Sequence, residues 1–106
     1  MQLFGRFYFK ETSNKNLVGE FSNNAGTRIY TESADLVKPD GGPFLGVYSS
    51  TWQEKDKESI FAELTIQRNG PLFKLKWREL PSNEMIFKGE GMLCDDILIG
   101  DYHSVP

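Results

Sequence analysis

Two groups of side chains near the C-terminus have types and spacing that could support proton transfer or metal binding. His103, the only histidine, follows Asp101 by two residues, so both would lie on one face of a strand as a carboxylate and histidine pair. Asp95 and Asp96 are adjacent, and with Asp101 they offer oxygen ligands for a hard cation. A simpler interpretation fits each group: a solvated strand face for His103 and a turn for the two aspartates. We therefore expect no catalytic residue and no metal site among them.

Two further residues bear on catalysis. Cys94, the only cysteine, stands beside Asp95, whose negative charge disfavours the thiolate form. No serine lies in a Gly-x-Ser-x-Gly elbow, so a nucleophilic hydrolase is not expected. Glu79 is expected to point inward near a strand end, where an isomerase or cyclase that shapes an apolar ligand could use it. Our prediction is nevertheless a non-catalytic protein that requires no cofactor.

Composition narrows the classes of partner. The formal net charge of −3 argues against a general nucleic-acid binder and against binding to an anionic membrane surface. A single cysteine excludes an intrachain disulfide and fits a reducing compartment. The N-terminal segment lacks a basic region followed by an apolar run, and no stretch approaches the ~20 apolar residues of a membrane span. We therefore expect a cytoplasmic protein with one domain, residues 1–106.

Strict alternation of apolar and polar residues predicts strands along most of the chain. In the clearest case, apolar residues recur at every second position from Ile60 to Ile66, and after Asn69-Gly70 the alternation resumes from Leu72 to Arg78. A hairpin that turns at Asn69-Gly70 would place Leu64 near Leu75 and Glu63 opposite Lys76. Further strands are predicted at 27–32 and 44–53, joined by a connection over 33–43 in which residues 34–37 could close one helical turn.

A repeated motif indicates how these strands assemble. Two apolar residues, a glycine, a spacer and an aromatic residue occur four times, with glycines Gly5, Gly19, Gly46 and Gly100. Glycine within a strand marks a bend or a close approach to the backbone. Pairing the first two strands in phase can set Gly5 opposite Phe21 and Phe7 opposite Gly19, each ring covering a bare backbone. With short linkers throughout, we predict an all-β protein of about eight antiparallel strands in an up-and-down barrel, with a β-sandwich as the alternative.

The glycine and aromatic strands, the alternating pattern and the single domain together resemble the calycin superfamily, the small barrels that include lipocalins and avidin-like proteins. The motif that would correspond to the lipocalin Gly-x-Trp of the first strand is Gly5-Arg6-Phe7. The resemblance implies a closed calycin-like barrel and concerns architecture alone.

Aromatic residues on the inward face suggest a function. A barrel of eight strands has an interior that side chains can just fill, or that can hold one small ligand. Our leading hypothesis is therefore a protein that binds a small apolar or aromatic ligand in the barrel, with the candidate ligand-binding residues Phe7, Phe21, Tyr48, Trp52, Trp77, Phe87 and Tyr102. The alternative is a filled core with an outward apolar patch for protein interaction or homo-oligomer formation, made by Phe4, Tyr8, Leu45, Val47, Phe61 and Ile99.

Overall fold

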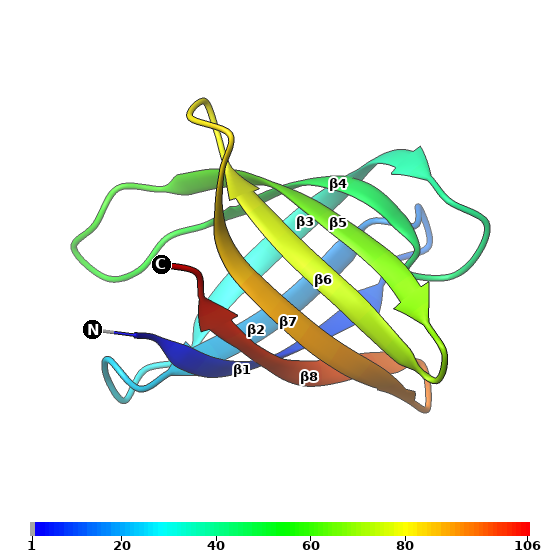
Figure 1. Ribbon diagram of the computed structural model, residues 1–106, viewed down its shortest axis with the longest axis horizontal. Helices are drawn as coiled ribbons and strands as arrows, with labels where there is room; N and C mark the ends of the chain where they lie inside the picture. Colours follow the sequence, from blue (N-terminus) through cyan, green and yellow to red (C-terminus); the bar gives the residue numbers. More distant parts are fainter. Residues whose placement is uncertain (1) are drawn as a thin grey trace.

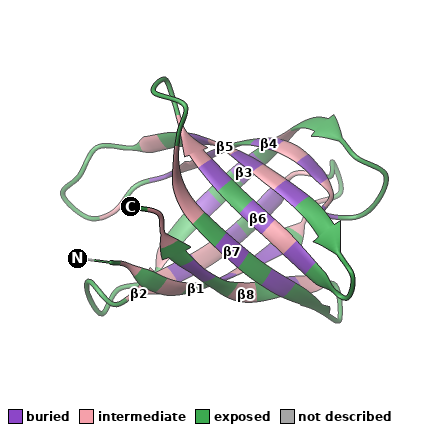
Figure 2. Cartoon of the chain, viewed as in Figure 1, coloured by how far each residue is buried: buried purple, intermediate pink, exposed green. Residues whose placement is uncertain are grey.

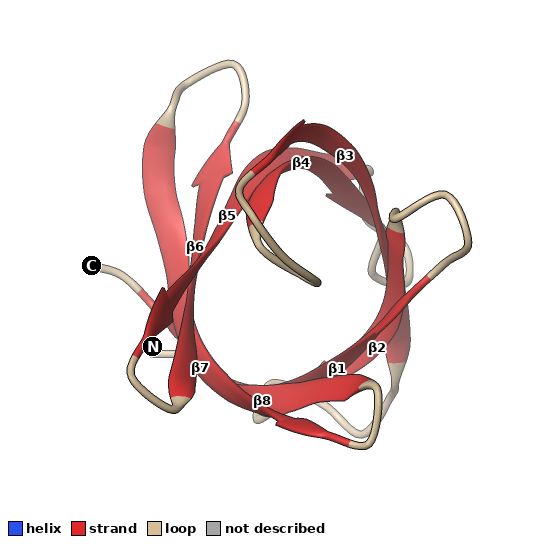
Figure 3. Ribbon diagram, turned by 90° about the vertical axis from the view of Figure 1, so that its right-hand side faces the viewer, coloured by secondary structure: helices blue, strands red, loops and turns tan. Residues whose placement is uncertain are grey.

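Eight antiparallel strands close into a barrel in a computed structural model that describes residues 2–106 (Figure 1). The strands are β1 (Phe4–Glu11), β2 (Leu17–Asn23), β3 (Tyr30–Pro39), β4 (Gly46–Trp52), β5 (Ile60–Asn69), β6 (Leu72–Glu79), β7 (Glu84–Cys94) and β8 (Ile97–Ser104). Each strand pairs with its neighbours in the chain, and β8 returns to β1, so no sheet edge is left open. The predicted fold class is confirmed, and closure of the ring excludes the sandwich alternative (Figure 3).

The two ends of the barrel differ in the loops that they carry. Both termini and the loops β2–β3, β4–β5 and β6–β7 lie at one end, whereas the other four connections lie at the opposite end (Figure 1). Along every strand, buried residues alternate with more exposed ones, because successive side chains point to opposite faces of the sheet (Figure 2). The inward residues form one core, which is dominated by aromatic and branched side chains.

Strand β3 is longer and begins later than the sequence pattern predicted. It runs from Tyr30 to Pro39, so the expected helical turn over residues 34–37 is wrong. Ala34 is fully buried and pairs with Ser50 of β4, and a register shift follows between Leu36 and Lys38. Pairing with β4, and with β2 as far as Ala34, satisfies more of the backbone of this segment than one isolated helical turn could.

The β5–β6 hairpin turns one residue later than expected. Its connection is Gly70-Pro71, so Leu64 lies opposite Trp77 instead of Leu75, and Glu63 lies opposite Arg78 instead of Lys76. The predicted turn at Asn69-Gly70 would require Pro71 to donate the closing hydrogen bond, and proline has no N–H. Moving the turn by one residue gives that position to Leu72 and keeps every side chain on its predicted face.

The first two strands also pair two residues away from the prediction. Phe7 lies opposite Phe21, and Phe9 lies opposite Gly19, whereas Phe7 had been expected opposite Gly19. The physical idea still holds with different partners, because the ring of Phe9 covers Gly19 and the ring of Tyr102 covers Gly5. Gly89 likewise lies opposite an aromatic residue, Tyr102.

Phe44 closes the barrel at the end away from the termini. It lies in the β3–β4 loop, is only 3% exposed and packs within the core. Its backbone N–H donates a hydrogen bond of 3.0 Å to Glu11 Oε2 at the end of β1. The loop is therefore fixed to the barrel wall while its aromatic ring fills this end of the interior.

Candidate functional site

Aromatic side chains gather around a small cavity at the end of the barrel that carries the termini. The cavity has a volume of about 20 Å³ and is lined by Phe21, Asn23, Glu32, Trp52, Glu54, Trp77, Phe87 and Tyr102, which we call the aromatic mouth. A volume of this size holds about one water molecule. Five of the seven predicted ligand-binding residues, namely Phe21, Trp52, Trp77, Phe87 and Tyr102, thus meet at one place.

Four of these rings form a closed circuit. Phe21 contacts Trp52 and Tyr102 with centroid distances of 6.2 Å in both cases. Phe87 completes the circuit, with its ring centroid 6.2 Å from that of Trp52 and 5.3 Å from that of Tyr102. Because the four rings come from β2, β4, β7 and β8, each supplies one side of the mouth.

Glycines make room for these rings. A Cβ atom on Gly5 would collide with the ring of Tyr102, and a Cβ atom on Gly89 would lie 3.3 Å from Cζ3 of Trp77. Both glycines stand on strands adjacent to the ring that covers them. The glycine positions in the sequence therefore help to place the aromatic mouth, as well as allowing the strands to approach closely.

Glu32 of β3 is the polar group at the base of the mouth. It is 4% exposed, and its Oε2 accepts a hydrogen bond of 2.5 Å from Ser50 Oγ and one of 2.8 Å from Trp77 Nε1. Burial raises the pKa of Glu32 to about 7, although the hydrogen bonds from Ser50 and Trp77 act in the opposite direction. A carboxyl group with such a pKa can carry a proton or a negative charge near neutral pH.

Sequence reasoning missed Glu32 because the third strand was expected to end there. The signal was present: Glu32, Ala34 and Leu36 alternate with polar or charged residues, which places Glu32 on the inward face if the strand continues. The carboxylate chosen instead, Glu79, is partly buried at the end of β6 and does not line the aromatic mouth.

Tyr102 supplies a second polar group at the mouth. Its hydroxyl accepts a hydrogen bond of 3.2 Å from Asn23 Nδ2 and donates one of 3.4 Å to the carbonyl oxygen of Ser22. Burial raises the pKa of Tyr102 to about 12, so the hydroxyl remains protonated at neutral pH. Asn23 and Ser22 thereby fix the orientation of the ring that covers Gly5.

The two remaining predicted residues lie elsewhere in the interior. Phe7 packs behind the mouth, with its ring centroid 5.9 Å from that of Trp77 and 5.6 Å from that of Phe9. Tyr48 lines a depression with Glu11, Lys15 and Leu36, toward the end closed by Phe44. Neither contributes to the lining of the aromatic mouth.

The acid and base candidates near the C-terminus do not assemble. His103 and Asp101 are both exposed, and His103 Nδ1 lies 3.1 Å from the carbonyl oxygen of Ser104. Cys94 is exposed at the start of the turn formed by Asp95 and Asp96 between β7 and β8. Among residues 2–106, no three His, Cys, Asp or Glu side chains gather closely enough to hold a metal ion.

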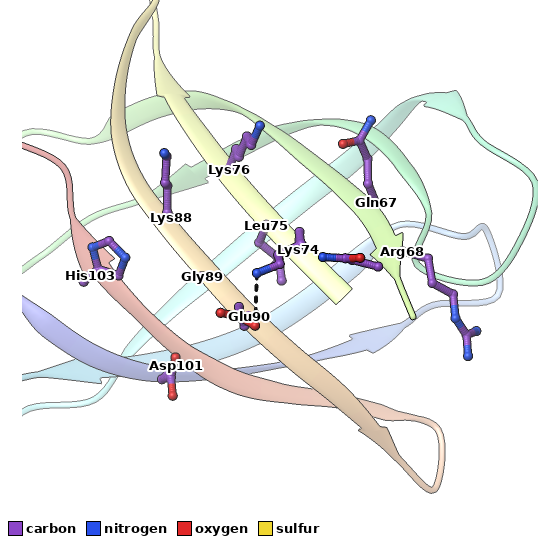
Figure 4. A pocket seen from close by; sticks show the side chains of 11 residues that line it. Gln67, Arg68, Lys74, Leu75, Lys76, Lys88, Gly89, Glu90, Asp101 and His103 are labelled. Atoms are coloured by element: carbon purple, nitrogen blue, oxygen red, sulfur yellow. Dashed lines mark ion pairs between the residues drawn. The ribbon is translucent and has the colours of Figure 1, made fainter. Parts of the chain in front are cut away.

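A larger concave area lies on the outer surface of the barrel, over β5 to β8. It has a volume of about 520 Å³, and its lining includes Lys74, Lys76, Lys88, Glu90 and His103 (Figure 4). Lys74 and Glu90 form an ion pair of 3.2 Å, whereas Lys76 lies directly opposite Lys88. This outer face thus carries an ion pair in one row of residues and two like charges in another row.

The apolar residues that were expected to form one outward patch are divided between two sides of the barrel. Tyr8 of β1 lies opposite Ile99 of β8. Phe61 lies on β5, which is four strands from β1 in either direction around the closed ring. Leu45 lies before the first residue of β4 and packs against the core. These residues do not form a continuous apolar surface.

No helix long and apolar enough to cross a membrane occurs in the part of the chain that the structure describes. Comparison with known proteins finds no matching family model, no matching curated protein and no matching solved structure.

Proposed function

We propose that this protein binds one small ligand with an apolar or aromatic body at the aromatic mouth, without catalysing a reaction on it. The observation that carries the proposal is the closed circuit of four rings around a cavity at an open end of the barrel. Ligand sites are mostly apolar and contain few polar groups, which orient the ligand. The aromatic mouth has this composition, with Glu32 and Tyr102 as the orienting groups.

The ligand enters by displacing rim side chains. The cavity admits about one water molecule as it stands, and Phe87 is only partly buried at its edge. Rotation of Phe87 outward would widen the mouth and leave Trp52 and Tyr102 as walls for an aromatic body. A calycin-like relationship is part of this proposal, since it rests on the shared eight-stranded closed barrel.

Tryptophan fluorescence tests the proposal directly. Both tryptophans of the chain, Trp52 and Trp77, line the aromatic mouth, so a ligand bound there should change the emission. Titration with 2-phenylethanol should give a saturable change in the wild type. Phe87→Trp, which enlarges the rim side chain, should weaken binding, whereas Phe61→Ala on the outer surface of β5 should leave it unchanged. A non-saturable change, or equal binding in the Phe87→Trp variant, would refute the proposed site.

A further inference from the structure

Glu32 is a buried carboxylate that forms no ion pair with any residue in the described part of the chain. The ion pairs within residues 2–106 are Lys57 with Glu54 and Lys74 with Glu90, and neither includes Glu32. Burying a negative charge is costly unless a positive charge or several hydrogen bonds compensate it. Residues 2–106 supply two hydrogen bonds and no ion pair to this carboxylate, so within them the site lacks the partner that an ionised carboxylate would favour.

One oxygen of Glu32 is free to make a further contact. Ser50 and Trp77 both donate to Oε2, and no other hydrogen bond in the described part of the chain reaches this side chain. Every fully buried side-chain oxygen among residues 2–106 has a hydrogen-bond partner, so Oε1, which has none, must retain accessible surface. Glu32 lines the aromatic mouth, so we infer that this oxygen is the one that a molecule in the cavity could contact.

The walls around that oxygen suit a cation as well. The circuit of Phe21, Trp52, Phe87 and Tyr102 surrounds the cavity. An aromatic ring attracts an ammonium group that lies over its face within about 6 Å of the centroid. The cavity of about 20 Å³ holds one water molecule, and a primary ammonium group has about the size of one water molecule. The charge of Glu32, its hydrogen-bonding capacity and the size of the cavity thus all favour a primary ammonium group.

We propose that the ligand of the aromatic mouth is a primary amine on an aromatic body, whose ammonium group occupies the cavity and donates a hydrogen bond to Glu32 Oε1. This inference rests on the proposed function and names its ligand class. The aromatic body extends outward past Phe87 toward Glu54 at the rim. Binding of the ammonium favours the ionised form of Glu32, so a proton leaves the carboxyl group to solvent whenever the free protein holds one there.

A matched series of ligands separates this inference from the proposed function. At pH 8, 2-phenylethylamine should bind the wild type at least about tenfold more tightly than 2-phenylethanol, which has the same ring and a neutral head. The N,N,N-trimethyl derivative should bind less tightly than the primary amine, because its head exceeds the cavity. If the amine and the alcohol bind equally, the ligand class is wrong and the aromatic site stands. If neither ligand binds, the proposed function and the ligand class are both wrong.

Variants locate the charge that the amine recognises. Glu32→Gln retains an oxygen that can accept from Ser50 and Trp77, and it should reduce the preference for the amine to within about twofold of the alcohol. Glu54→Gln, which removes the rim carboxylate, should preserve the preference. If the amine preference survives in Glu32→Gln, or disappears in Glu54→Gln, the assignment of the ammonium to Glu32 is wrong.

A calorimetric measurement tests the inference in the wild type, independently of whether Glu32→Gln folds. Near pH 7, binding of 2-phenylethylamine should release protons, whereas binding of 2-phenylethanol should not. Titration in buffers with different ionisation enthalpies measures this release. Equal proton release for both ligands would contradict an ammonium at Glu32.

Discussion

Trp77 Nε1 donates a hydrogen bond of 2.8 Å to Glu32 Oε2 across the interior of the barrel, between strands β6 and β3 that do not pair with each other. The two residues are 45 positions apart in the chain. The bond therefore links opposite parts of the wall through the core, and it holds the carboxyl group and one aromatic ring of the mouth in a fixed relation.

Loss of this bond should destabilise the fold. Trp77→Phe retains an aromatic ring but leaves Glu32 with Ser50 as its remaining donor. We expect the free energy of unfolding to fall by about 2 kcal/mol, measured by urea denaturation followed by circular dichroism. Phe61→Ala, at an exposed ring, provides the control. Equal stability of Trp77→Phe and the wild type would show that the bond contributes little.

Stability should depend on pH through Glu32. Its pKa rises from 4.5 to about 7 on folding, so between these values the folded state binds more protons than the unfolded state. The proton on Glu32 therefore contributes its full stabilisation of the folded state below pH 4.5, and this contribution is lost as the pH rises through about 7. The shift corresponds to about 3 kcal/mol. Tyr102 and Glu54 share the mouth with Glu32 and are also present in the Glu32→Gln variant. The difference in stability between wild type and variant therefore isolates the pH dependence that Glu32 causes.

The measurement is a series of urea denaturations of the wild type and Glu32→Gln from pH 4 to pH 8. The variant should gain stability relative to the wild type as the pH rises. A constant difference across this range would mean that the pKa of Glu32 is the same in the folded and unfolded states.

Substitution of Gly19 should be far more harmful than substitution of Gly26. A Cβ atom on Gly19 would collide with the carbonyl oxygen of Tyr8 and lie 2.8 Å from the ring of Phe9. No described atom lies within 4 Å of the place that a Cβ atom on Gly26 would take. We expect Gly19→Ala to lower the free energy of unfolding by about 3 kcal/mol, and Gly26→Ala to change it by less than about 0.5 kcal/mol. Thermal or urea denaturation measures both, and similar effects would contradict the close approach at Gly19.

Reversal of one charge on the outer surface should stabilise the barrel. Lys76 and Lys88 lie directly opposite each other, so Lys88→Glu replaces a repulsive pair by an attractive one. The expected gain is about 0.5 kcal/mol in low salt. Lys74→Glu should have the opposite sign, because it breaks the ion pair with Glu90. Both effects should shrink at high ionic strength. Destabilisation by both substitutions would mean that the net charge of −3, which each of them makes more negative, and not pairing, governs the effect.

Local patterns in the sequence were sufficient to predict the fold class, but they did not predict the register in which neighbouring strands pair. Alternation decides which face a side chain occupies, and it therefore predicted the inward rings correctly. Register depends on where a turn can close, and the missing N–H of Pro71 moved the β5–β6 turn by one residue. The Phe9 and Gly19 pairing likewise depends on which rings fit together across the interior, a property of all eight strands.

The candidate site was predictable only where strand alternation decides which side chains point inward. Five aromatic residues of the mouth followed from strand alternation and the expectation of a barrel. Glu32 did not, because the pattern predicts that the strand ends at this residue, whereas β3 continues to Pro39. Its partners Ser50 and Trp77 come from β4 and β6, and only the closed ring brings them together.

One opening leads to the proposed site, because the packed core fills the interior behind the aromatic mouth and the opposite end is closed by Phe44. Its ring fills the end opposite the aromatic mouth, and the hydrogen bond from its backbone to Glu11 fixes the loop that carries it. A ligand would therefore arrive and depart by the same route, and the water that it displaces would have to leave before the rim closes. Two ligands could not pass each other, so exchange of one occupant for another would proceed through the empty protein, at a rate that the outgoing molecule alone determines.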